Sequence, residues 1–382
     1  MSLLEVYKRF PQTIVKAKGS YLWDDEGNKY LDFYAGHAVC SMGHAFEPLV
    51  KAVQKQAEEF YFYSNIFHMK PAVDLAAKMV AAMQSPYKVY LTNSGSEANE
   101  AAIKMARKAS GKKKMISFEN SFHGRGITGI GVTGIDFYHK FEPNLDEYTN
   151  FAELGNMESV REAWEEDVAA VICEPIQSIG GVNMASYEFY KELADFCAEK
   201  GIYLIFDEVQ TGCGRCGDYW FANIVGIEPD FITTAKGIAS GLPLAAVMVK
   251  DGIEVNAGEH ATTFGGGNIP CVAACAVFDK LGEPGFFEAL NVRSQKIKDQ
   301  LGAFGEGYLL GIEIECDDLV KKCLVEGLII GGSAKKNIYR ITPPLTVSDE
   351  EVDEFLEKFK KASSGMIIKV FIIRSLKAKF LL

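Results

Sequence analysis

Three ionisable residues, Glu174, Asp207 and Lys236, each stand at the end of a short apolar run that is typical of a buried β-strand. In open α/β sheets, ligands bind just outside the carboxyl ends of the strands, so charged residues at that edge are candidates for chemistry. Any one of them could also be a helix cap or a solvated loop residue. The three together favour a shared binding site.

Asp207 and Lys236 form the pair that pyridoxal 5'-phosphate (PLP) chemistry requires. A lysine can form an imine with the aldehyde of PLP, and a carboxylate can keep the pyridine nitrogen protonated. The same lysine can carry a proton between carbon atoms as general base and acid. Small and apolar residues flank Lys236 between 234 and 244, so we expect burial to lower its pKa and to favour nucleophilic attack.

A dianionic phosphate also needs hydrogen-bond donors. Residues 92–96 (TNSGS) lie between a predicted strand and a predicted helix, where backbone N–H groups at the helix start and nearby hydroxyls can bind an anion. The alternative is an ordinary N-cap at Ser94 with Glu97 in the first turn. One helix start can serve both purposes.

Other patterns carry less weight. Residues 129–134 match the GxGxxG spelling of a dinucleotide loop but lack a convincing helix after them, and residues 213–216 match CxxC without a second pair at zinc-site spacing. His37 and His44 could flank a pocket, but the six histidines show no metal pattern, and no metal site is expected. Lys112 to Lys114 is interpreted as a solvated loop.

The candidate residues lie within an alternation of strands and helices that predicts an α/β fold with a mainly parallel sheet. The expected strands are 89–91, 115–118, 169–173, 202–206, 231–234 and 245–249, and the expected helices are 97–108, closed by Gly111, and 187–200. A hairpin is expected over 19–33 with its turn at 25–28. Residues 309–315 (extended) and 349–361 (helical) should form a smaller α+β domain with that hairpin.

The length, composition and net charge of the chain disfavour some classes of function. The chain has 382 residues, 48% of them apolar, a net charge of −11 and nine scattered cysteines. An acidic surface disfavours nucleic acid, and no apolar run is long enough for a membrane span. No signal peptide is apparent, and cysteines within apolar runs are typical of reduced thiols, so we expect a cytoplasmic protein with no nucleic-acid or membrane partner.

Five motifs surround Lys236 in a characteristic order: NSGSEANEA at 93–101, SFHGR at 121–125, EPIQ at 174–177, FDEVQTG at 206–212 and TTFGG at 262–266. Together they closely resemble class III (ω-amino acid) aminotransferases of PLP fold type I, over about residues 5 to 362. Within that class the likeness is to acetylornithine aminotransferases, including relatives that prefer succinylornithine. The resemblance implies a large domain with a seven-stranded-type sheet and a smaller α+β domain. The expected divisions are 1–50 (small domain), 51–277 (large PLP-binding domain), 278–365 (small domain) and 366–382, an atypical tail for which a non-functional interpretation is favoured.

The resemblance also implies roles for individual residues. For the cofactor, it assigns Gly95 and Ser96 to the phosphate, Phe122 to stacking on the ring, Asp207 to the ring nitrogen, Val209 to packing under the ring, Gln210 to the phenolic oxygen, Lys236 to the Schiff base, and Thr263 to the phosphate bound in the other subunit of a homodimer. For the substrate, it assigns Arg125 and Arg340 to carboxylates, Thr262 to a place near the substrate, and Glu174 to the substrate-binding residues. Guanidinium groups suit carboxylates because they bind them in a bidentate manner.

The implied reaction transfers the terminal amine of N-acetyl-L-ornithine to 2-oxoglutarate, giving N-acetylglutamate 5-semialdehyde and glutamate, as in arginine biosynthesis. Succinylornithine, ornithine, lysine or 4-aminobutyrate as donor, an aminomutase, and a non-catalytic PLP-binding protein remain alternatives. Two segments depart from the family pattern. Residues 174–181 read EPIQSIGG in place of EPIQGEGG, so Ile179 stands where a Glu that can pair with Arg340 is usual. The loop after Thr263 reads TFGGGNIP in place of TFGGNPL.

Overall fold

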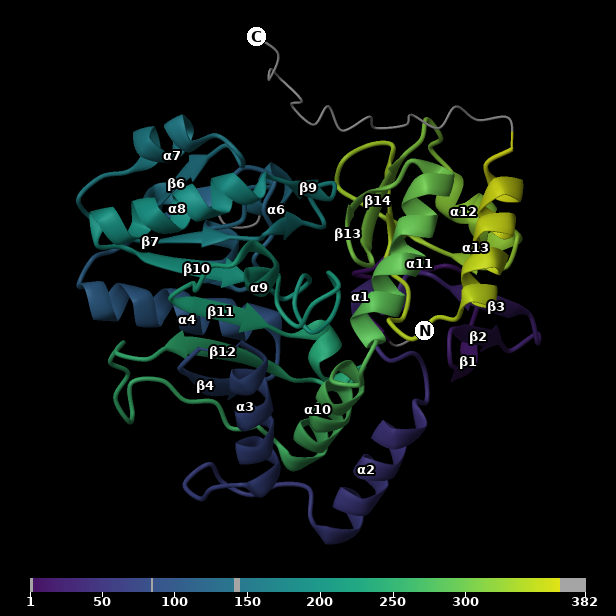
Figure 1. The fold of residues 1–382 in the computed structure, drawn as a ribbon, viewed down its shortest axis with the longest axis horizontal. Helices are drawn as coiled ribbons and strands as arrows, with labels where there is room; N and C mark the ends of the chain where they lie inside the picture. Colours follow the sequence, from purple (N-terminus) through teal and green to yellow (C-terminus); the bar gives the residue numbers. More distant parts are fainter. Residues whose placement is uncertain (1–2, 84, 141–144, 365–382) are drawn as a thin grey trace.

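A computed structural model describes residues 3–83, 85–140 and 145–364, with the side chains of residues 145 and 146 left out. The predicted tail 366–382 lies outside the described residues. Figure 1 shows two parts side by side, a larger part built on a wide sheet and a smaller part that contains both the first strands and the last helix of the described chain.

The larger part is organised by a seven-stranded sheet, which confirms the predicted α/β class. In spatial order its strands are β4 (Tyr87–Thr92), β12 (Ala245–Lys250), β11 (Phe231–Thr234), β10 (Tyr203–Asp207), β7 (Val168–Cys173), β5 (Lys114–Phe118) and β6 (Thr149–Ala152). Strand β12 runs in the opposite direction to the other six. Every residue of β7 is buried, as a strand covered on both faces requires.

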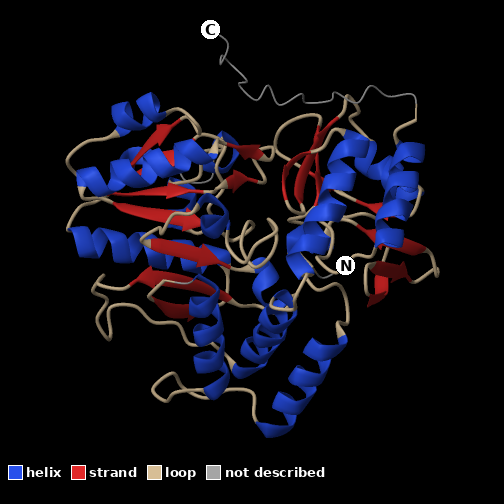
Figure 2. Ribbon diagram, viewed as in Figure 1, coloured by secondary structure: helices blue, strands red, loops and turns tan. Residues whose placement is uncertain are grey.

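Helices cover both faces of this sheet (Figure 2). On one face, alanines of α4 pack against alternate strand residues, and on the other face α8 packs against the remaining ones. The helices of the larger part are α2 (Glu47–Glu59), α3 (Lys70–Met83), α4 (Gly95–Ser110), α5 (Ile127–Gly131), α6 (Asp136–His139), α7 (Met157–Ala163), α8 (Tyr187–Lys200), α9 (Phe221–Val225) and α10 (Asn268–Leu281), with 3₁₀ turns at Leu145–Tyr148 and Lys236–Ala239. Short strands β8 (Ile176–Gln177) and β9 (Asn183–Met184) pair with each other.

The smaller part combines the two ends of the described chain. One sheet holds β1 (Ile14–Lys18), β2 (Tyr21–Asp24), β3 (Lys29–Asp32) and β15 (Leu328–Ile329), and another holds β13 (Phe304–Glu306), β14 (Leu309–Glu313), β17 (Ile338–Ile341) and β16 (Gly331–Gly332). Its helices are α11 (Phe286–Leu301), α12 (Leu319–Val325) and α13 (Asp349–Ala362), and the turn α1 (Ala35–Ala38) follows β3. The predicted hairpin is therefore confirmed, and its strand β3 pairs in parallel with β15.

A separate hydrophobic core supports this smaller part. Phe33 from the N-terminal segment stacks on Phe355 of α13, with ring centroids 4.2 Å apart. Side chains from β14, β17 and α13 complete the same core. Such a core fits the predicted small domain, whose exact boundaries stay a prediction.

The predicted helices and strands agree with the observed ones, apart from small differences at their ends. Helix α4 begins after Ser94, whose hydroxyl accepts from the N–H of Glu97, and ends at Gly111 in the left-handed conformation, as expected. Asp207 is the last residue of β10 rather than the residue after the strand, because the ladder with β11 extends to it. Among the described residues, no helix has the length and apolar character needed to cross a bilayer.

Candidate active site

Glu174, Asp207 and Lys236 meet at one edge of the sheet. Strands β7, β10 and β11 are parallel neighbours, so their carboxyl ends lie together. All three side chains line one cavity of about 510 Å³. The same cavity is lined by six more of the predicted site residues: Gly95, Ser96, Phe122, Arg125, Val209 and Gln210. The sheet thus brings together residues that are widely separated in the sequence.

Asp207 is the best-supported side chain of the site. Its Oδ2 atom lies 2.8 Å from Nδ1 of His123 and accepts from the side-chain amide of Asn99 at 2.7 Å, while Oδ1 accepts from the N–H of Val209 at 3.0 Å. Asn99 is fixed in turn by the hydroxyl of Thr233 at 2.6 Å. A carboxylate held in this way, 3% exposed, suits a cationic ring nitrogen.

Lys236 stands opposite this carboxylate in a strained backbone conformation. Its φ of 45° lies in the left-handed region, which costs a non-glycine residue on the order of 1–3 kcal/mol and is found mainly at functional sites. Burial lowers the pKa of the Lys236 amine to about 8, an effect that Asp207 and Glu174 oppose and Arg340 reinforces. The expected fall in its pKa is therefore present, and none of the ion pairs among the described residues includes Lys236.

The start of α4, where the sequence predicts an anion site, lines the same cavity. Gly95 passes so close to Val209 that an added Cβ would lie 2.8 Å from a methyl group, so only glycine fits there. The hydroxyl of Ser96 accepts from the N–H of Gly126 at 3.3 Å. With this helix start, the lysine and the supported carboxylate on one cavity, the residues present fit PLP.

Glu174 lies deep in the cavity, 4% exposed, beside the predicted ring-stacking residue. Its Oε1 atom accepts from the N–H of Phe122 at 2.6 Å. Burial, reinforced by the charge of Asp207, raises the pKa of Glu174 well above its usual range. The ring of Tyr138 contacts Phe122 edge-on at 5.2 Å and lies 4.9 Å from the guanidinium carbon of Arg125. Tyr138 therefore helps to fix both residues.

Arg340 lies outside the lining of this cavity but within electrostatic reach of Lys236. It is 4% exposed, and its Nη1 group donates to the hydroxyl of Ser178 at 3.1 Å. Ser178 donates in turn to Oε1 of Gln210 at 3.1 Å, which links the arginine to the cavity wall. Ile179, the departure from the family pattern, offers Arg340 no side-chain acceptor.

Thr262 and Thr263 lie close to the cavity of Lys236 but are not part of its lining. The hydroxyl of Thr262 accepts from the side-chain amide of Asn93, which lines the cavity, at 3.1 Å. Thr263 is exposed and does not line the cavity of its own chain. Its predicted contact with a phosphate in another subunit stays a prediction.

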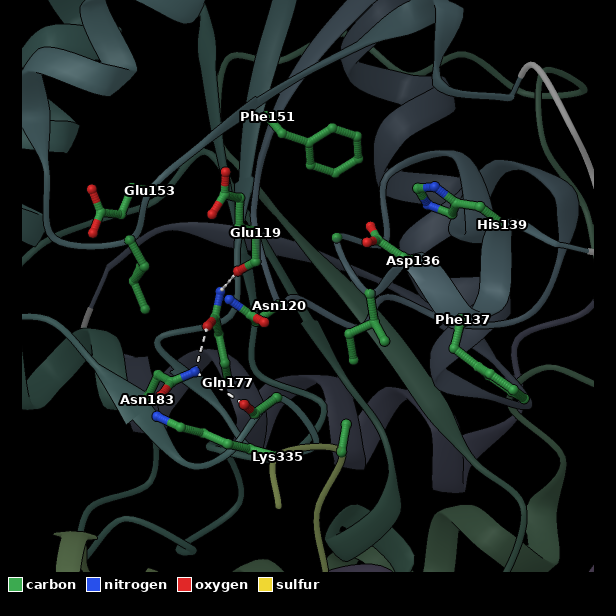
Figure 3. Close-up of a pocket in the computed structure, with 15 residues that line it drawn as sticks. Glu119, Asn120, Asp136, Phe137, His139, Phe151, Glu153, Gln177, Asn183 and Lys335 are labelled. Atoms are coloured by element: carbon green, nitrogen blue, oxygen red, sulfur yellow. Dashed lines mark hydrogen bonds between the residues drawn. The ribbon is translucent and has the colours of Figure 1, made fainter. Parts of the chain in front are cut away.

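A larger hollow, about 1010 Å³, lies beside β8. Figure 3 shows Gln177 in its wall, where the side-chain amide donates to the carbonyl of Glu119 at 2.7 Å and accepts from Asn183 at 3.2 Å. Lys335 of the smaller part runs along the same wall. Although this hollow is larger, it holds neither a supported carboxylate opposite its lysine nor a long helix start, so we place the chemistry in the cavity of Lys236.

The weaker motifs do not form sites. Residues 129–134 run from the short helix α5 into a tight turn, where an added Cβ on Gly134 would lie 2.1 Å from the carbonyl of Phe118. Cys213 and Cys216 are buried free thiols, and no cluster of potential metal ligands occurs in the described part of the chain. His44 is paired with Asp32 at 2.9 Å.

Sequence reasoning did not single out several residues that contact the predicted site residues. His123 lies inside the SFHGR motif and Asn99 inside NSGSEANEA, so the motifs could have pointed to both as partners of Asp207. Tyr34, which contacts Arg340, and Tyr138, which contacts Arg125, carry no comparable signal, because only the fold brings them to their partners. Ser178, which accepts from Arg340, lies in the segment 174–181 that departs from the family pattern.

Known proteins resemble this chain over most of its length. The family model for aminotransferase class-III matches residues 5–363. The acetylornithine aminotransferase of Caldanaerobacter subterraneus subsp. tengcongensis is 38% identical over 377 residues, covering 93% of this chain and 95% of that protein. The acetylornithine aminotransferase of Aquifex aeolicus is 39% identical over 374 residues, covering 94% of this chain and 99% of that protein.

Solved structures agree with the sequence matches. The ornithine aminotransferase of Toxoplasma gondii superposes with a TM-score of 0.89 at 28% identity, covering 94% of this chain and 92% of that chain. The N-acetylornithine aminotransferase of Stenotrophomonas maltophilia superposes with a TM-score of 0.81 at 28% identity, covering 93% and 96%. The predicted fold type, cofactor and enzyme class are thereby confirmed, and this chain belongs to the class-III family of PLP-dependent aminotransferases.

Proposed function

We propose that the enzyme transfers the terminal amine of N-acetyl-L-ornithine to 2-oxoglutarate, giving N-acetylglutamate 5-semialdehyde and glutamate. The observation that carries this proposal is Arg340, a buried guanidinium within electrostatic reach of Lys236, together with a second arginine, Arg125, on the cavity wall. Two arginines match the two carboxylates of 2-oxoglutarate. The names of the relatives at 38–39% identity support the acylated donor.

Each cavity residue has a part in this reaction. Bound PLP supplies an electron sink for the carbanion formed when the carbon that bears the amine loses its proton. Lys236 would hold the cofactor covalently, and its amine would act as general base and acid for the proton on the carbon that bears the amine. Asp207 would keep the ring nitrogen protonated, and His123 and Asn99 hold Asp207 in place.

The remaining assignments concern the two faces and the ends of the cofactor. Gly95 and Ser96 bind the phosphate at the start of α4, where backbone N–H groups and the helix dipole favour an anion. Phe122 and Val209, which line the cavity, would contact the ring, and Gln210 would serve its phenolic oxygen. Glu174, through its hydrogen bond to the N–H of Phe122, keeps that ring in position beside the substrate.

The functional unit is proposed to be a homodimer with shared active sites. Large apolar side chains between Phe60 and Phe67 are exposed, among them Tyr61 at 66% and Ile66 at 80%, and Phe264 is 66% exposed. Phe62 and Phe264 form one surface, with ring centroids 5.4 Å apart. A patch of this kind favours association, and Thr263 next to it would reach the partner's cofactor. A cytoplasmic location stays a prediction.

A half-reaction screen tests the substrate. The PLP-loaded enzyme is mixed with one donor at a time, and the change in cofactor absorbance is followed without 2-oxoglutarate. N-acetylornithine should react fastest, ahead of succinylornithine, ornithine, lysine and 4-aminobutyrate. A faster reaction with any of the others would replace the proposed donor. Consumption of many equivalents of donor without 2-oxoglutarate would favour an aminomutase, because an aminotransferase stops after one equivalent per active site. No absorbance change with any donor would favour a non-catalytic protein.

A further inference from the structure

The guanidinium of Arg340 is held by neutral acceptors from three segments of the chain. Nε donates to the carbonyl of Gly332 at 2.7 Å, Nη1 to the hydroxyl of Ser178 at 3.1 Å and Nη2 to the hydroxyl of Tyr34 at 3.2 Å. A guanidinium carries five N–H donors. The described residues therefore engage three of them and leave one on each terminal nitrogen, the number that a bidentate carboxylate needs.

No carboxylate of the described residues forms an ion pair with this buried guanidinium, and the charge of Glu174 acts on it only from a longer distance. None of the ion pairs among the described residues includes Arg340, and burial lowers its pKa. At the neighbouring positions 178 and 179, the chain has a serine that accepts from Arg340 and an isoleucine that cannot. Because a buried cation without a counter-ion is costly, an incoming anion gains more here than it would at a paired arginine.

The direction of the hydrogen bonds at Tyr34 follows from the chemistry of its neighbours. Arginine can only donate, so the Tyr34 oxygen accepts from Arg340 and its own proton is free to be donated. His37 receives it, because Nδ1 of His37 lies within hydrogen-bonding distance of the Tyr34 hydroxyl, with Nε2 farther away at 3.2 Å. The guanidinium carbon also lies 5.6 Å from the centre of the Tyr34 ring.

The backbone that carries this pair is strained. Ala35, Gly36, His37 and Ala38 have φ values of 47°, 56°, 67° and 63°, so α1 is a left-handed turn. L-residues avoid this conformation, and where it persists in a structure it points to a functional constraint.

Three hydrogen bonds hold the turn in place. Asp32 accepts from the N–H groups of Tyr34 and Ala35 at 3.0 and 2.8 Å. Thr342 donates to the carbonyl of Tyr34 at 2.9 Å. At Gly331 an added Cβ would lie 2.3 Å from the Tyr34 ring, so the strand next to Arg340 leaves room for that ring only because it has no side chain there.

We propose that Tyr34, with His37 as its hydrogen-bond acceptor, is a positioning residue that holds Arg340 ready to bind a carboxylate attached to the reacting carbon. This inference rests on the proposed function and deepens it. In 2-oxoglutarate the reacting carbon bears a carboxylate directly, whereas in N-acetylornithine the carbon that bears the terminal amine does not. Tyr34 and His37 therefore serve the acceptor half-reaction and have little effect on the donor half-reaction.

The test compares Tyr34→Phe, His37→Leu and His37→Gln in the full-length PLP-loaded enzyme. Tyr34→Phe keeps the ring but removes the hydroxyl, and should raise the KM for 2-oxoglutarate about tenfold, the effect of one hydrogen bond to a charged group. His37→Leu should raise it severalfold, and His37→Gln, which restores an acceptor, should return it to within about twofold of the parent. The rate with N-acetylornithine should change less than twofold in all three.

A second readout does not depend on turnover. Glutarate, an unreactive dicarboxylate, should bind the holoenzyme about tenfold more weakly by calorimetry in Tyr34→Phe than in the parent. Tyr87→Phe is the matched control, since it also removes one buried hydroxyl, bonded to the carbonyl of Pro229 at 2.6 Å, at the opposite end of β4 from the cavity. It should leave glutarate binding unchanged.

The outcomes separate the two proposals. The role of Tyr34 would be overturned if Tyr34→Phe lost activity equally in both half-reactions. It would also be overturned if this variant kept the parent's affinity for glutarate and the parent's melting temperature. The role of His37 would be overturned if the KM for 2-oxoglutarate stayed as high in His37→Gln as in His37→Leu. In another outcome, the parent reacts fastest with a different amine, while Tyr34→Phe still binds glutarate more weakly than the parent and Tyr87→Phe does not. In that case the proposed donor is wrong and the positioning role of Tyr34 stands.

Discussion

Nδ1 of His123 lies 2.8 Å from Oδ2 of Asp207, at the carboxyl end of β10 and inside the cavity of Lys236. Asn99 donates to the same oxygen atom, so two side chains from different segments converge on one carboxylate oxygen. Its other oxygen accepts from a backbone N–H. The carboxylate is therefore held in one orientation and remains available to a ring nitrogen.

Replacing Asp207 with Asn should lower turnover on the order of a hundredfold or more, because the amide cannot stabilise a protonated ring nitrogen. The measurements are steady-state rates and the absorbance spectrum of the bound cofactor. Asp230→Asn is the matched control: Asp230 accepts from the N–H of Leu204 at 2.8 Å and does not line the cavity. Equal losses in both variants would point to a general folding defect.

Replacing Lys236 with Ala should lower turnover at least a thousandfold while PLP still binds without a covalent link. Borohydride treatment followed by peptide mass analysis should find the cofactor attached at Lys236 in the parent and nowhere in the variant. Lys236→Arg keeps the charge without the nucleophile and should be equally inactive. Activity in either variant within tenfold of the parent would refute the assignment.

Capture of PLP by the cofactor-free enzyme should depend on pH in a way set by the lowered pKa of Lys236, about 8. Only the neutral amine attacks the aldehyde, so the rate should rise with pH up to about 8 and then level off. An unperturbed lysine, with a pKa of 10.5, would give a rate that keeps rising through pH 10. Stopped-flow absorbance at a series of pH values distinguishes the two profiles.

Gly331 and Gly332 offer a matched pair of substitutions beside Arg340. Gly331→Ala should displace the Tyr34 ring, since the new Cβ would lie 2.3 Å from it, and raise the KM for 2-oxoglutarate. Gly332→Ala meets no atom within 4 Å and keeps the carbonyl that Arg340 uses, so its KM should match the parent. A change of the same size in both variants would mean that backbone flexibility, and not the contact with Tyr34, is responsible.

A negative charge introduced by mutation into the exposed apolar surface around Phe264 should disrupt the proposed dimer. Phe264→Asp should shift the protein towards monomer in sedimentation velocity and weaken retention of PLP, because Thr263 lies beside it. Val325→Asp is the control, at a position 85% exposed on α12 in the smaller part. If Phe264→Asp sediments like the parent, this surface is not the interface.

Much of the site was readable from the sequence because its signals are local. Lys236 and Glu174 follow runs that are typical of buried strands, and Ser94 and Gly111 mark the ends of α4 with residue types that favour helix ends. Five motifs around Lys236 then identified the family. The end of β10 at Asp207 is not set by a local signal, since it depends on how far the ladder with β11 continues.

The surroundings of Arg340 were decided by tertiary structure alone. Ile179 revealed in advance that a usual acidic partner is missing, but not that Ser178, Gly332 and Tyr34 would replace it. Ser178 and Tyr34 lie 162 and 306 positions from Arg340 in the sequence, so no local pattern couples them to it. The left-handed turn at Tyr34 is likewise hidden from the sequence, because it is stable only where Asp32, Thr342 and the bare backbone of Gly331 hold it. Local propensity sets where elements begin and end, whereas packing between distant segments determines which donors and acceptors meet.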